Sequence, residues 1–381
     1  MEMPIPTQQS SGETLHGKRT VAHRQTSIKE KMHMKALVYH GKGKRAWEDH
    51  PIPAIQHATD AIVKISKTTI CATDLLIVHG ELPEVETGRI LGHEGVGVIE
   101  EVGNSVMNFK TGDKVLISCI TSCGKCTACK NGMYSHCENG GGWMLGHLVD
   151  GTHAEYVRIP FADTSFYAIP DGIDEAALTM LSDIFPAGFE CGVANGQIKP
   201  GDAIAIIGAG PVGLATLLTA QFYSPAEIIM IDEDENRLEV AQMLGATRLL
   251  HSANGDVVEK VLKITGGKGV DVAIEAVGRC ETFEICQSIV KAGGRIANVG
   301  MHGKSIDLHL DKLWAKNVTI TTKLVDTAST PMLLKVVQSG RLRPQKLITH
   351  RFSMHDILKA YDTFENATEE KAIKVLLTNE R

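Results

Sequence analysis

The sequence has few aromatic residues, no long hydrophobic run and no excess of positive charge. Phe, Trp and Tyr make up 5% of its 381 residues. No apolar stretch approaches the roughly 18 residues that a membrane-spanning helix needs. Lys and Arg number 39 against 45 Asp and Glu, a net charge of −6. These shortages argue against a membrane protein. They also argue against a nucleic-acid-binding protein, because such a protein usually has a basic face.

The first 33 residues read as a separate segment. They are polar and lack both periodicity and the apolar core of a secretory signal peptide. Basic and hydroxyl residues are compatible with a transit peptide, but Glu2, Glu13 and Glu30 argue against one. We therefore expect a disordered arm, or an upstream start codon read in error, and a folded protein that begins at Met34.

What the sequence does contain is a pattern typical of a mixed α/β protein. Its length allows two domains, and 37 glycines with 43% hydrophobic residues suit many tight turns around a core. Residues 34–170 form short strand-like stretches separated by Gly, Pro and Asp. From about residue 186, apolar strands alternate with helical patterns, which predicts a parallel, doubly wound sheet. The chain ends in another strand-like stretch, residues 371–378.

Four of the nine cysteines lie close together, at Cys123, Cys126, Cys129 and Cys137. Such short spacing lets one loop fold around an ion, and four thiolates complete a zinc tetrahedron without an open position. Ordinary thiols or disulfides are the alternative, but cysteines three residues apart are poorly placed for a disulfide. We therefore predict a structural zinc site. The cluster is typical of a reducing compartment, so we expect a cytoplasmic protein.

A glycine-rich turn follows the apolar strand near residue 205 and opens a helix. Helix N-terminal amides at such a turn can hold a pyrophosphate. The same pattern alone also serves ordinary strand-to-helix packing, but its place between a strand and a helix favours dinucleotide binding. The residues of this fingerprint are Gly208, Gly210, Pro211, Val212 and Gly213.

Asp232 lies 19 residues beyond Gly213, at the end of the next predicted strand. A carboxylate there can accept hydrogen bonds from the adenosine ribose and repel the extra phosphate of NADP, which predicts NAD as the cofactor. A helix cap or a solvated acid is the alternative. Arg237 can stack on adenine or bind a 2′-phosphate. The acidic residues 233–235 favour the stacked arrangement.

Cys71 and the pair His93 and Glu94 precede the cysteine loop. Taken singly, Cys71 is most simply explained as a small buried hydrophobe, and His93 as an ordinary hydrogen-bonded histidine. Both lie on segments that end in polar turns, ahead of a zinc loop. In combination they suggest a second metal site that is open.

In these motifs and their order, the chain from about Met34 to its end resembles the zinc-dependent medium-chain alcohol dehydrogenases. The resemblance covers GHEGVGVIEEVG, the cysteine loop and the fingerprint. It implies a β-rich, GroES-like catalytic domain, a Rossmann domain and a return segment, with the active site in the cleft. We expect the catalytic domain over residues 34–185, with a zinc lobe near 119–140. The Rossmann domain is expected over residues 186–324 and the return segment over residues 325–381.

The resemblance also implies the ligands of a catalytic zinc, beginning with Cys71 and His93. The third ligand is a cysteine or a carboxylate in the family. Here LSDIFPAGFECG is closest to the bacterial branch with aspartate, which assigns Asp183 rather than Cys191. Glu94 approaches the metal in the family, with a structural ion pair as its alternative role. Two Zn²⁺ ions per chain are therefore expected.

Zinc with three protein ligands keeps a fourth position for an alcohol oxygen and makes its hydroxyl more acidic. Thr73 matches the family hydroxyl that contacts the substrate oxygen and begins the proton relay. Many relatives continue that relay with a histidine where this chain has Leu76. The proton then leaves through ribose and water, or through His79 if its loop bends inward. We expect Asp74 to order the turn or to support the zinc ligands.

Other contacts follow from the resemblance alone. Val277 and Val299 end strands near the family's nicotinamide site. Lys374 aligns with a basic residue that the family uses on the pyrophosphate. Candidate walls of the substrate pocket, each equally well explained as core, are Trp143, Leu145 and Leu324.

The resemblance implies an NAD-dependent dehydrogenase of primary or secondary alcohols that also reduces the aldehyde or ketone. A polyol, threonine or formaldehyde dehydrogenase would share this machinery and differ in the pocket. A catalytically silent structural relative is the alternative from another class, and it would lack NAD binding or hold zinc only in the cysteine loop. We expect a small-molecule substrate, no nucleic-acid or membrane partner, and a homo-oligomer, a tetramer in preference to a dimer.

Overall fold

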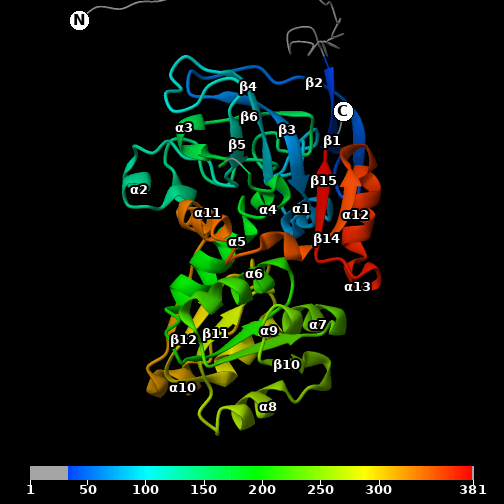
Figure 1. Cartoon of the computed structure of the whole chain (residues 1–381). Coiled ribbons are helices and arrows are strands. Elements are labelled where there is room, and N and C mark those ends of the chain that lie inside the picture. Colours follow the sequence, from blue (N-terminus) through cyan, green and yellow to red (C-terminus); the bar gives the residue numbers. More distant parts are fainter. Residues whose placement is uncertain (1–32, 171, 380–381) are drawn as a thin grey trace, which may run out of the picture. The chain divides into compact units, whose positions relative to one another are not determined.

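The computed structural model describes residues 33–170 and 172–379, and two large sheets organise this part of the chain (Figure 1). The first sheet has the order β14-β15-β3-β4-β5-β7, and β6 pairs with β3 beside this path. Its pairs are antiparallel except β14 with β15. Its strands are β3 (Ala61–Thr69), β4 (Gly95–Val102), β5 (Lys114–Ile117), β6 (Tyr156–Ile159), β7 (Phe166–Ala168), β14 (Ile348–Ser353) and β15 (Lys374–Thr378).

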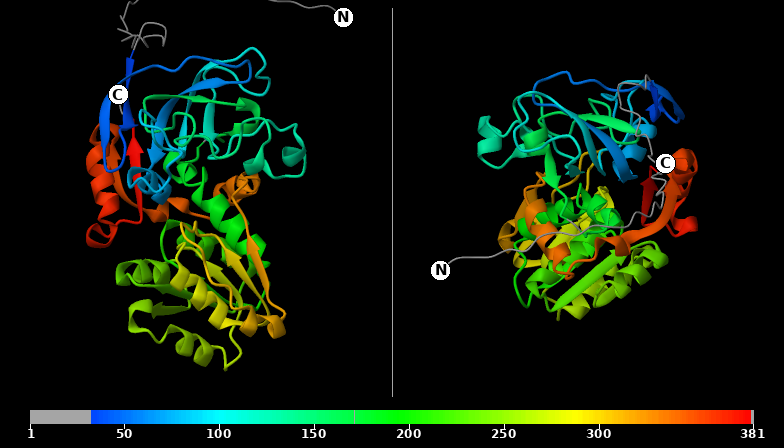
Figure 2. Two further views of the ribbon diagram at one scale, coloured as in Figure 1. Left: turned by 180° about the vertical axis from the view of Figure 1, so that it is seen from behind. Right: turned by 45° about the horizontal axis from the view of Figure 1, so that its top comes forward.

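The second sheet is parallel throughout, with the order β10-β9-β8-β11-β12-β13. Figure 2 shows it from behind as well. Its strands are β8 (Ala203–Ile207), β9 (Glu227–Asp232), β10 (Arg248–His251), β11 (Val270–Glu275), β12 (Val290–Asn298) and β13 (Thr319–Thr322). The helices between them are α6 (Pro211–Ala220), α7 (Glu235–Met243), α8 (Val257–Ile264), α9 (Cys280–Ile289) and α10 (Leu310–Leu313).

Strand β8 shows why this sheet is buried on both faces. Ile204 and Ile206 belong to one hydrophobic cluster, whereas Ala205 and Ile207 belong to another. Successive side chains of a strand point to opposite faces, so an unbroken apolar run places a core on each side of the sheet.

The remaining elements flank the two sheets. A two-stranded antiparallel sheet consists of β1 (His33–Tyr39) and β2 (Arg45–Pro51). The other α-helices are α1 (Ala72–Val78), α2 (Thr127–Lys130), α3 (Ala162–Ser165), α4 (Glu175–Thr179), α5 (Ile184–Ala187), α11 (Thr330–Gln338), α12 (Ile357–Glu365) and α13 (Ala367–Glu370). Helix α5 continues without a break into the π-helical turn η3 (Gly188–Ala194). The 3₁₀ turns are η2 (Tyr134–His136), η4 (Gln221–Tyr223), η5 (Ser252–Asn254), η6 (Trp314–Lys316), η7 (Pro344–Leu347) and η8 (Met354–Asp356).

The fold class predicted from the sequence is confirmed: a parallel sheet with interleaved helices accompanies a β-rich part. Strands β14 and β15, from the end of the chain, pair with each other and through β15 with β3. The domain boundaries stay a prediction. Of the arm predicted over residues 1–33, residues 1–32 lie outside the described residues, and His33 begins β1. Within the described residues, no helix combines the length and apolar character needed to cross a membrane.

Candidate active site and metal centres

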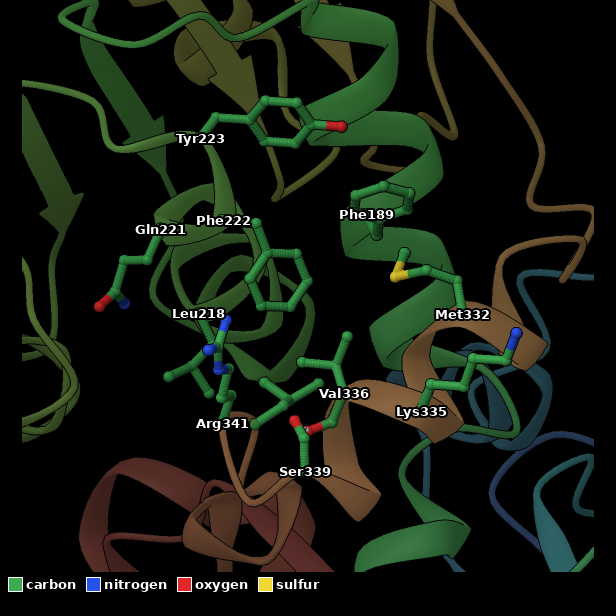
Figure 3. Close-up of a pocket in the computed structure, with 11 residues that line it drawn as sticks. Phe189, Leu218, Gln221, Phe222, Tyr223, Met332, Lys335, Val336, Ser339 and Arg341 are labelled. Carbon is green, nitrogen blue, oxygen red and sulfur yellow. Dashed lines mark hydrogen bonds between the residues drawn. The ribbon is translucent and has the colours of Figure 1, made fainter.

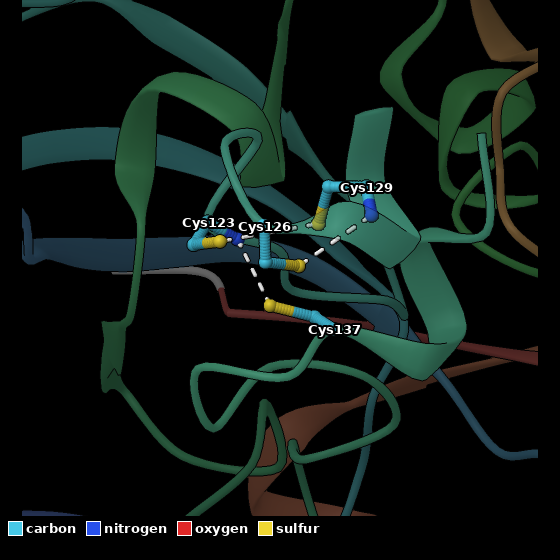
Figure 4. A group of neighbouring side chains, drawn as sticks. All are labelled: Cys123, Cys126, Cys129 and Cys137. Atoms are coloured by element: carbon cyan, nitrogen blue, oxygen red, sulfur yellow. Dashed lines mark hydrogen bonds between the residues drawn. The ribbon is translucent and has the colours of Figure 1, made fainter. Parts of the chain in front are cut away.

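The loop with the four closely spaced cysteines brings their sulfur atoms together. Figure 4 shows Cys123, Cys126, Cys129 and Cys137 pointing toward one another, and their Sγ atoms all lie within 4.8 Å of one another. Cys123 Sγ lies 4.0 Å from Cys129 Sγ. A tetrahedron with Zn–S bonds of about 2.3 Å has edges of about 3.8 Å, so the spacing suits one zinc ion.

The electrostatics of this loop also fit a cation. Burial acts to raise the pKa of Cys123, but the N–H groups of Lys125 and Cys126 outweigh it and lower the pKa to about 6. Burial and the Cys126 thiol raise the pKa of Cys129 to about 12. Neighbouring thiolates disfavour one another, so ionisation of all four needs a positive charge between them. Zn²⁺ fits that requirement.

A second group of side chains that could hold a metal ion, called the second metal-binding group below, converges from three separate segments. Cys71 is the N-cap residue of α1, His93 lies just before β4, and Asp183 is the N-cap residue of α5. Asp183 Oδ2 lies 3.8 Å from Cys71 Sγ and 3.4 Å from His93 Nε2. One donor atom from each residue lies within 4.8 Å of the other two. A thiolate, an imidazole and a carboxylate are zinc ligands, and three of them leave a position open.

The charges around His93 fit a cation as well. Burial acts to lower the pKa of His93, but the carboxylates of Asp74 and Asp183 outweigh it and raise the pKa. Burial acts to raise the pKa of Asp183, and the hydrogen bond and charge of His93 outweigh it and lower the pKa. The pair therefore favours an extra proton on His93 beside the ionised Asp183. A cation held between the two side chains would take the place of that proton.

Asp74 orders the turn that carries Cys71, as expected. Its fully buried carboxylate accepts hydrogen bonds from Cys71 N at 2.8 Å and from Gly92 N at 3.2 Å. Its Oδ1 lies 3.6 Å from His93 Nδ1, on the side of the ring away from Asp183. A carboxylate at Nδ1 leaves Nε2 free for a metal and fixes the ring.

Thr73 lies beside the metal-binding group, with its Oγ1 3.6 Å from Cys71 Sγ. His79 does not turn inward. It is an exposed side chain whose ring faces Glu365 at 3.8 Å and Glu81 at 4.0 Å. These contacts therefore do not support proton transfer from the site through His79.

Glu94 and Lys374 meet beside the same site. Lys374 Nζ donates hydrogen bonds to Glu94 Oε2 and to the Ile70 carbonyl, the latter at 3.0 Å. Burial raises the pKa of Glu94, to about 7, although the ammonium of Lys374 acts against the rise. The ion pair named as an alternative role for Glu94 is present. Glu94 Oε1 has no hydrogen-bond partner among the described residues.

This ion pair sets the surroundings of Lys374. Its side chain is 0% exposed and faces inward from β15, where the buried Glu94 carboxylate requires a positive partner. A contact of Lys374 with the cofactor pyrophosphate stays a prediction.

Sequence reasoning missed one side chain at the site, Cys119. Its thiol lies 3.4 Å from Asp183 Oδ1 and can donate a hydrogen bond to it. Burial and Asp183 raise the pKa of Cys119, which keeps the thiol protonated as a donor. Cys119 follows β5 four residues before the cysteine loop, and no spacing pattern separates it from an ordinary buried cysteine.

Cys191 is not part of the metal-binding group formed by Cys71, His93 and Asp183. It lies in the π-helical turn η3, one of a cluster of buried residues with Cys119, Ile120 and Val325.

The fingerprint turn has the geometry of an anion site. Gly208 adopts φ +104°, where a side chain is strained, and a Cβ on Gly213 would collide with the Gly208 carbonyl. Gly210 is the N-cap residue of α6, and Pro211 is its first residue. A Cβ on Gly210 would meet no atom within 4 Å. That open space at a helix N-terminus fits a pyrophosphate.

Asp232 lies at the end of β9 and is buried. Its Oδ2 accepts a hydrogen bond from Ala209 N at 2.6 Å, and its Oδ1 accepts one from Asp234 N at 2.8 Å. The carboxylate therefore also fastens the fingerprint turn. Each oxygen keeps further acceptor capacity, so a contact to ribose hydroxyls stays a prediction.

Arg237 lies in α7, with its Nε 3.9 Å from Asp234 Oδ2. The side chain lines a small hollow that Lys371 and Ile373 also line. Stacking of Arg237 on adenine stays a prediction.

Val277 and Val299 follow β11 and β12, at the carboxyl end of the parallel sheet. Val277 is 40% exposed, and its N donates to the buried Glu275 carboxylate at 2.9 Å. Val299 packs against a cluster that includes Cys119, whose thiol contacts Asp183.

The three candidate pocket walls have different surroundings. The Trp143 ring stands edge-on to His93 with centroids 6.3 Å apart, and it stacks on His147 at 4.1 Å. Leu324 is 47% exposed. Leu145 is fully buried within a hydrophobic cluster of the β-rich part, so it belongs to the core.

A hollow of about 890 Å³ lies elsewhere, between η3, the end of α6 with η4, and α11 (Figure 3). None of the predicted site residues lines it. Its lining residues are Phe189, Leu218, Gln221, Phe222, Tyr223, Met332, Lys335, Val336, Ser339, Arg341 and Leu342.

Comparisons with known proteins agree with this geometry. The family model for the alcohol dehydrogenase GroES-like domain matches residues 57–171, and that for zinc-binding dehydrogenases matches residues 211–339. An alcohol dehydrogenase of Cupriavidus necator is 37% identical over 352 residues, which cover 87% of this chain and 95% of its own.

Two further relatives bear on structure and cofactor. The solved apo form of zinc-dependent alcohol dehydrogenase 2 from Streptococcus pneumoniae has 50% identity and a TM-score of 0.88, covering 91% of this chain and 99% of its own. An NADP-dependent isopropanol dehydrogenase of Entamoeba histolytica is 32% identical, covering 84% of this chain and 88% of its own.

Proposed function

The chain belongs to the zinc-dependent medium-chain alcohol dehydrogenase family, and we propose that it interconverts primary or secondary alcohols and their aldehydes or ketones with NAD. The observation that carries this proposal is the convergence of Cys71, His93 and Asp183, whose donor atoms lie within 4.8 Å of one another. Zinc, when bound there, supplies a Lewis acid that lowers the pKa of an alcohol hydroxyl or polarises a carbonyl.

The chain's own residues hold this site in place. Asp74 fixes the Cys71 turn and the His93 ring. Cys119 hydrogen-bonds the second oxygen of Asp183, which directs Oδ2 toward Cys71 and His93. Such supporting contacts orient metal ligands and are worth about 10–100-fold in affinity or activity.

Thr73 is the group proposed to take the proton of the substrate hydroxyl, because its Oγ1 lies 3.6 Å from Cys71 Sγ. Leu76 cannot accept that proton onward. The side chain of His79 is directed to surface carboxylates. We therefore propose that the proton leaves through the cofactor ribose and water.

The open space at Gly210 and the N-terminus of α6 support a dinucleotide pyrophosphate. Asp232 supports NAD over NADP, because a carboxylate beside the ribose repels a 2′-phosphate. The NADP dependence named for the Entamoeba histolytica relative makes this cofactor preference a property to measure.

We further propose a cytoplasmic homo-oligomer, a tetramer in preference to a dimer. Strand β13 is the edge of the parallel sheet. Trp314 and Leu310, in the segment before β13, are 77% and 60% exposed. An open strand edge next to exposed large apolar side chains is typical of a surface that another chain covers.

The proposal is tested by assaying the zinc-loaded protein with primary and secondary alcohols, polyols, threonine and formaldehyde, each with NAD and with NADP. We expect reduction of NAD with simple alcohols. Turnover confined to polyols, threonine or formaldehyde would identify the related dehydrogenases. Absence of nicotinamide binding would support a catalytically silent relative.

A further inference from the structure

The segment between β13 and α11 is attached to the four-cysteine loop. Asp326, whose side chain is buried, accepts hydrogen bonds at Oδ1 from Ser135 N at 2.9 Å and from Ser135 Oγ at 2.7 Å. Its Oδ2 lies 3.0 Å from Lys323 Nζ. Ser135 belongs to η2, in the stretch between Cys129 and Cys137. The loop that gathers the four thiols therefore supplies two donors to one buried carboxylate.

The same segment is attached on its other side to the helix that carries Asp183. Glu190 lies in η3, which continues α5 from its N-cap residue Asp183. The Glu190 carboxylate accepts hydrogen bonds from Asp326 N at 2.9 Å, Ser329 N at 2.8 Å and Ser329 Oγ at 2.7 Å. Two buried acids thus fix the backbone of residues 326–329.

The backbone between these attachments is strained and needs them. Thr327 has φ +59°, a left-handed conformation that a β-branched residue rarely adopts. Its Oγ1 lies 2.7 Å from Ser118 Oγ, and its carbonyl accepts a hydrogen bond from Tyr167 OH at 2.7 Å. Such a conformation persists only where the surrounding structure holds it.

The position of this segment gives the attachments a functional meaning. Val325 packs in one cluster with Cys119 and Cys191, and Val299 packs against that cluster. Cys119 contacts Asp183. Val325, the residue before this fixed stretch, therefore shares one cluster with Cys119, the neighbour of Asp183, and with Val299, which the family resemblance places near the nicotinamide.

We propose that zinc in the four-cysteine loop is coupled to nicotinamide binding through Ser135, Asp326 and Glu190. Ser135 lies two residues before Cys137, so closure of the loop on its ion sets where both Ser135 donors point. An open loop would leave the Asp326 carboxylate buried with fewer partners, which is costly. Coupling between two binding sites is reciprocal, so a bound nicotinamide also slows loss of the loop zinc. The cofactor half of this inference rests on the proposed function.

The test is the rate at which the zinc-loaded full-length protein releases zinc to a chromogenic chelator, with and without NADH. The phase of zinc release that disappears in the Cys71→Ser variant comes from the catalytic site. The phase that remains reports release from the four-cysteine loop. We compare wild type with Ser135→Ala, with Ser135→Thr, which keeps both donors, and with the control Ser105→Ala. Ser105 is exposed, and within residues 33–170 and 172–379 its hydroxyl hydrogen-bonds only the neighbouring Asn104.

We expect Ser135→Ala to release the loop zinc about tenfold faster, the equivalent of one hydrogen bond to a charged group. Ser135→Thr should stay within about twofold of wild type, and Ser105→Ala should not differ. NADH should slow release from wild type and lose most of that effect in Ser135→Ala. Equal release from wild type and Ser135→Ala, or equal protection of both by NADH, overturns the proposal.

Failure of the proposed function can be told apart from failure of the coupling. If NADH binds none of these proteins, the proposed function and the cofactor half of the coupling both fail. Faster zinc release from Ser135→Ala without NADH would still establish the link between the four-cysteine loop and residues 325–329.

If Ser135→Ala does not fold, hydrogen exchange of residues 325–330 in the wild-type protein replaces this variant. Exchange there should rise on removal of the loop zinc, and unchanged exchange overturns the proposal.

Discussion

Lys374 and Glu94 form an ion pair in which neither side chain has exposed surface. Glu94 directly follows His93, so the pair lies beside the proposed catalytic zinc. Each charge depends on the other, because a buried charge without a partner is strongly destabilising. The pair therefore explains why Lys374 faces inward.

Replacement of Lys374 by Met should lower the free energy of unfolding by about 3–5 kcal/mol, since the Glu94 carboxylate would remain buried without its cation. Urea unfolding of Lys374→Met against wild type measures this. The double variant Lys374→Met with Glu94→Gln removes both charges and should recover much of the loss. A single variant as stable as wild type would show that the pair does not hold this region.

Replacement of Asp183 by Ala should reduce the zinc content from about two ions per chain to about one, because the catalytic site would keep only two protein ligands. Turnover should fall at least about a thousandfold with the Lewis acid lost. Metal analysis and initial rates measure the two effects. Cys191→Ala is the matched control, since Cys191 lies on the same helix outside the metal-binding group, and it should retain two zinc ions. Loss of zinc from Cys191→Ala instead would reverse the ligand assignment.

Two glycines of the fingerprint should respond differently to alanine. Gly210→Ala should fold normally, since its Cβ meets open space, but should weaken nicotinamide binding by occupying the pyrophosphate site. Gly213→Ala should lower the melting temperature, because its Cβ meets the Gly208 carbonyl. Thermal unfolding and cofactor titration separate the two effects. Unchanged cofactor affinity in Gly210→Ala would place the pyrophosphate elsewhere.

Asp232→Ala should weaken discrimination between NAD and NADP by removing the charge that repels a 2′-phosphate. Affinity for NAD should fall as well, because Asp232 also holds Ala209 N of the fingerprint turn. The ratio of kcat/KM for the two cofactors is the measurement. A parent enzyme that already prefers NADP would contradict the ribose assignment.

The sequence allowed prediction of those features that local spacing encodes. The four cysteines lie in one short loop, and the fingerprint follows a continuous apolar strand, so neighbouring residues carried the information. The proposed third ligand Asp183 needed the family resemblance, because it lies 112 residues from Cys71. The two come together only through the folded backbone.

Contacts that depend on long-range packing were not predictable in the same way. Nothing near Lys374 in the sequence indicates its buried partner, because Glu94 lies 280 residues away. Cys119 looked like core, and its contact with Asp183 depends on how β5 packs beside α5. The attachment of Ser135 to Asp326 spans 191 residues and joins two segments of ordinary polar composition.

We propose that this chain oxidises alcohols with a zinc ion held by Cys71, His93 and Asp183. The most direct test removes zinc from the protein, returns it in steps, and follows NADH formation from NAD and simple alcohols. We expect activity to be lost with the metal and restored as the zinc content approaches about two ions per chain. Absence of turnover with either nicotinamide at full zinc content, or turnover that persists without zinc, would rule out this function.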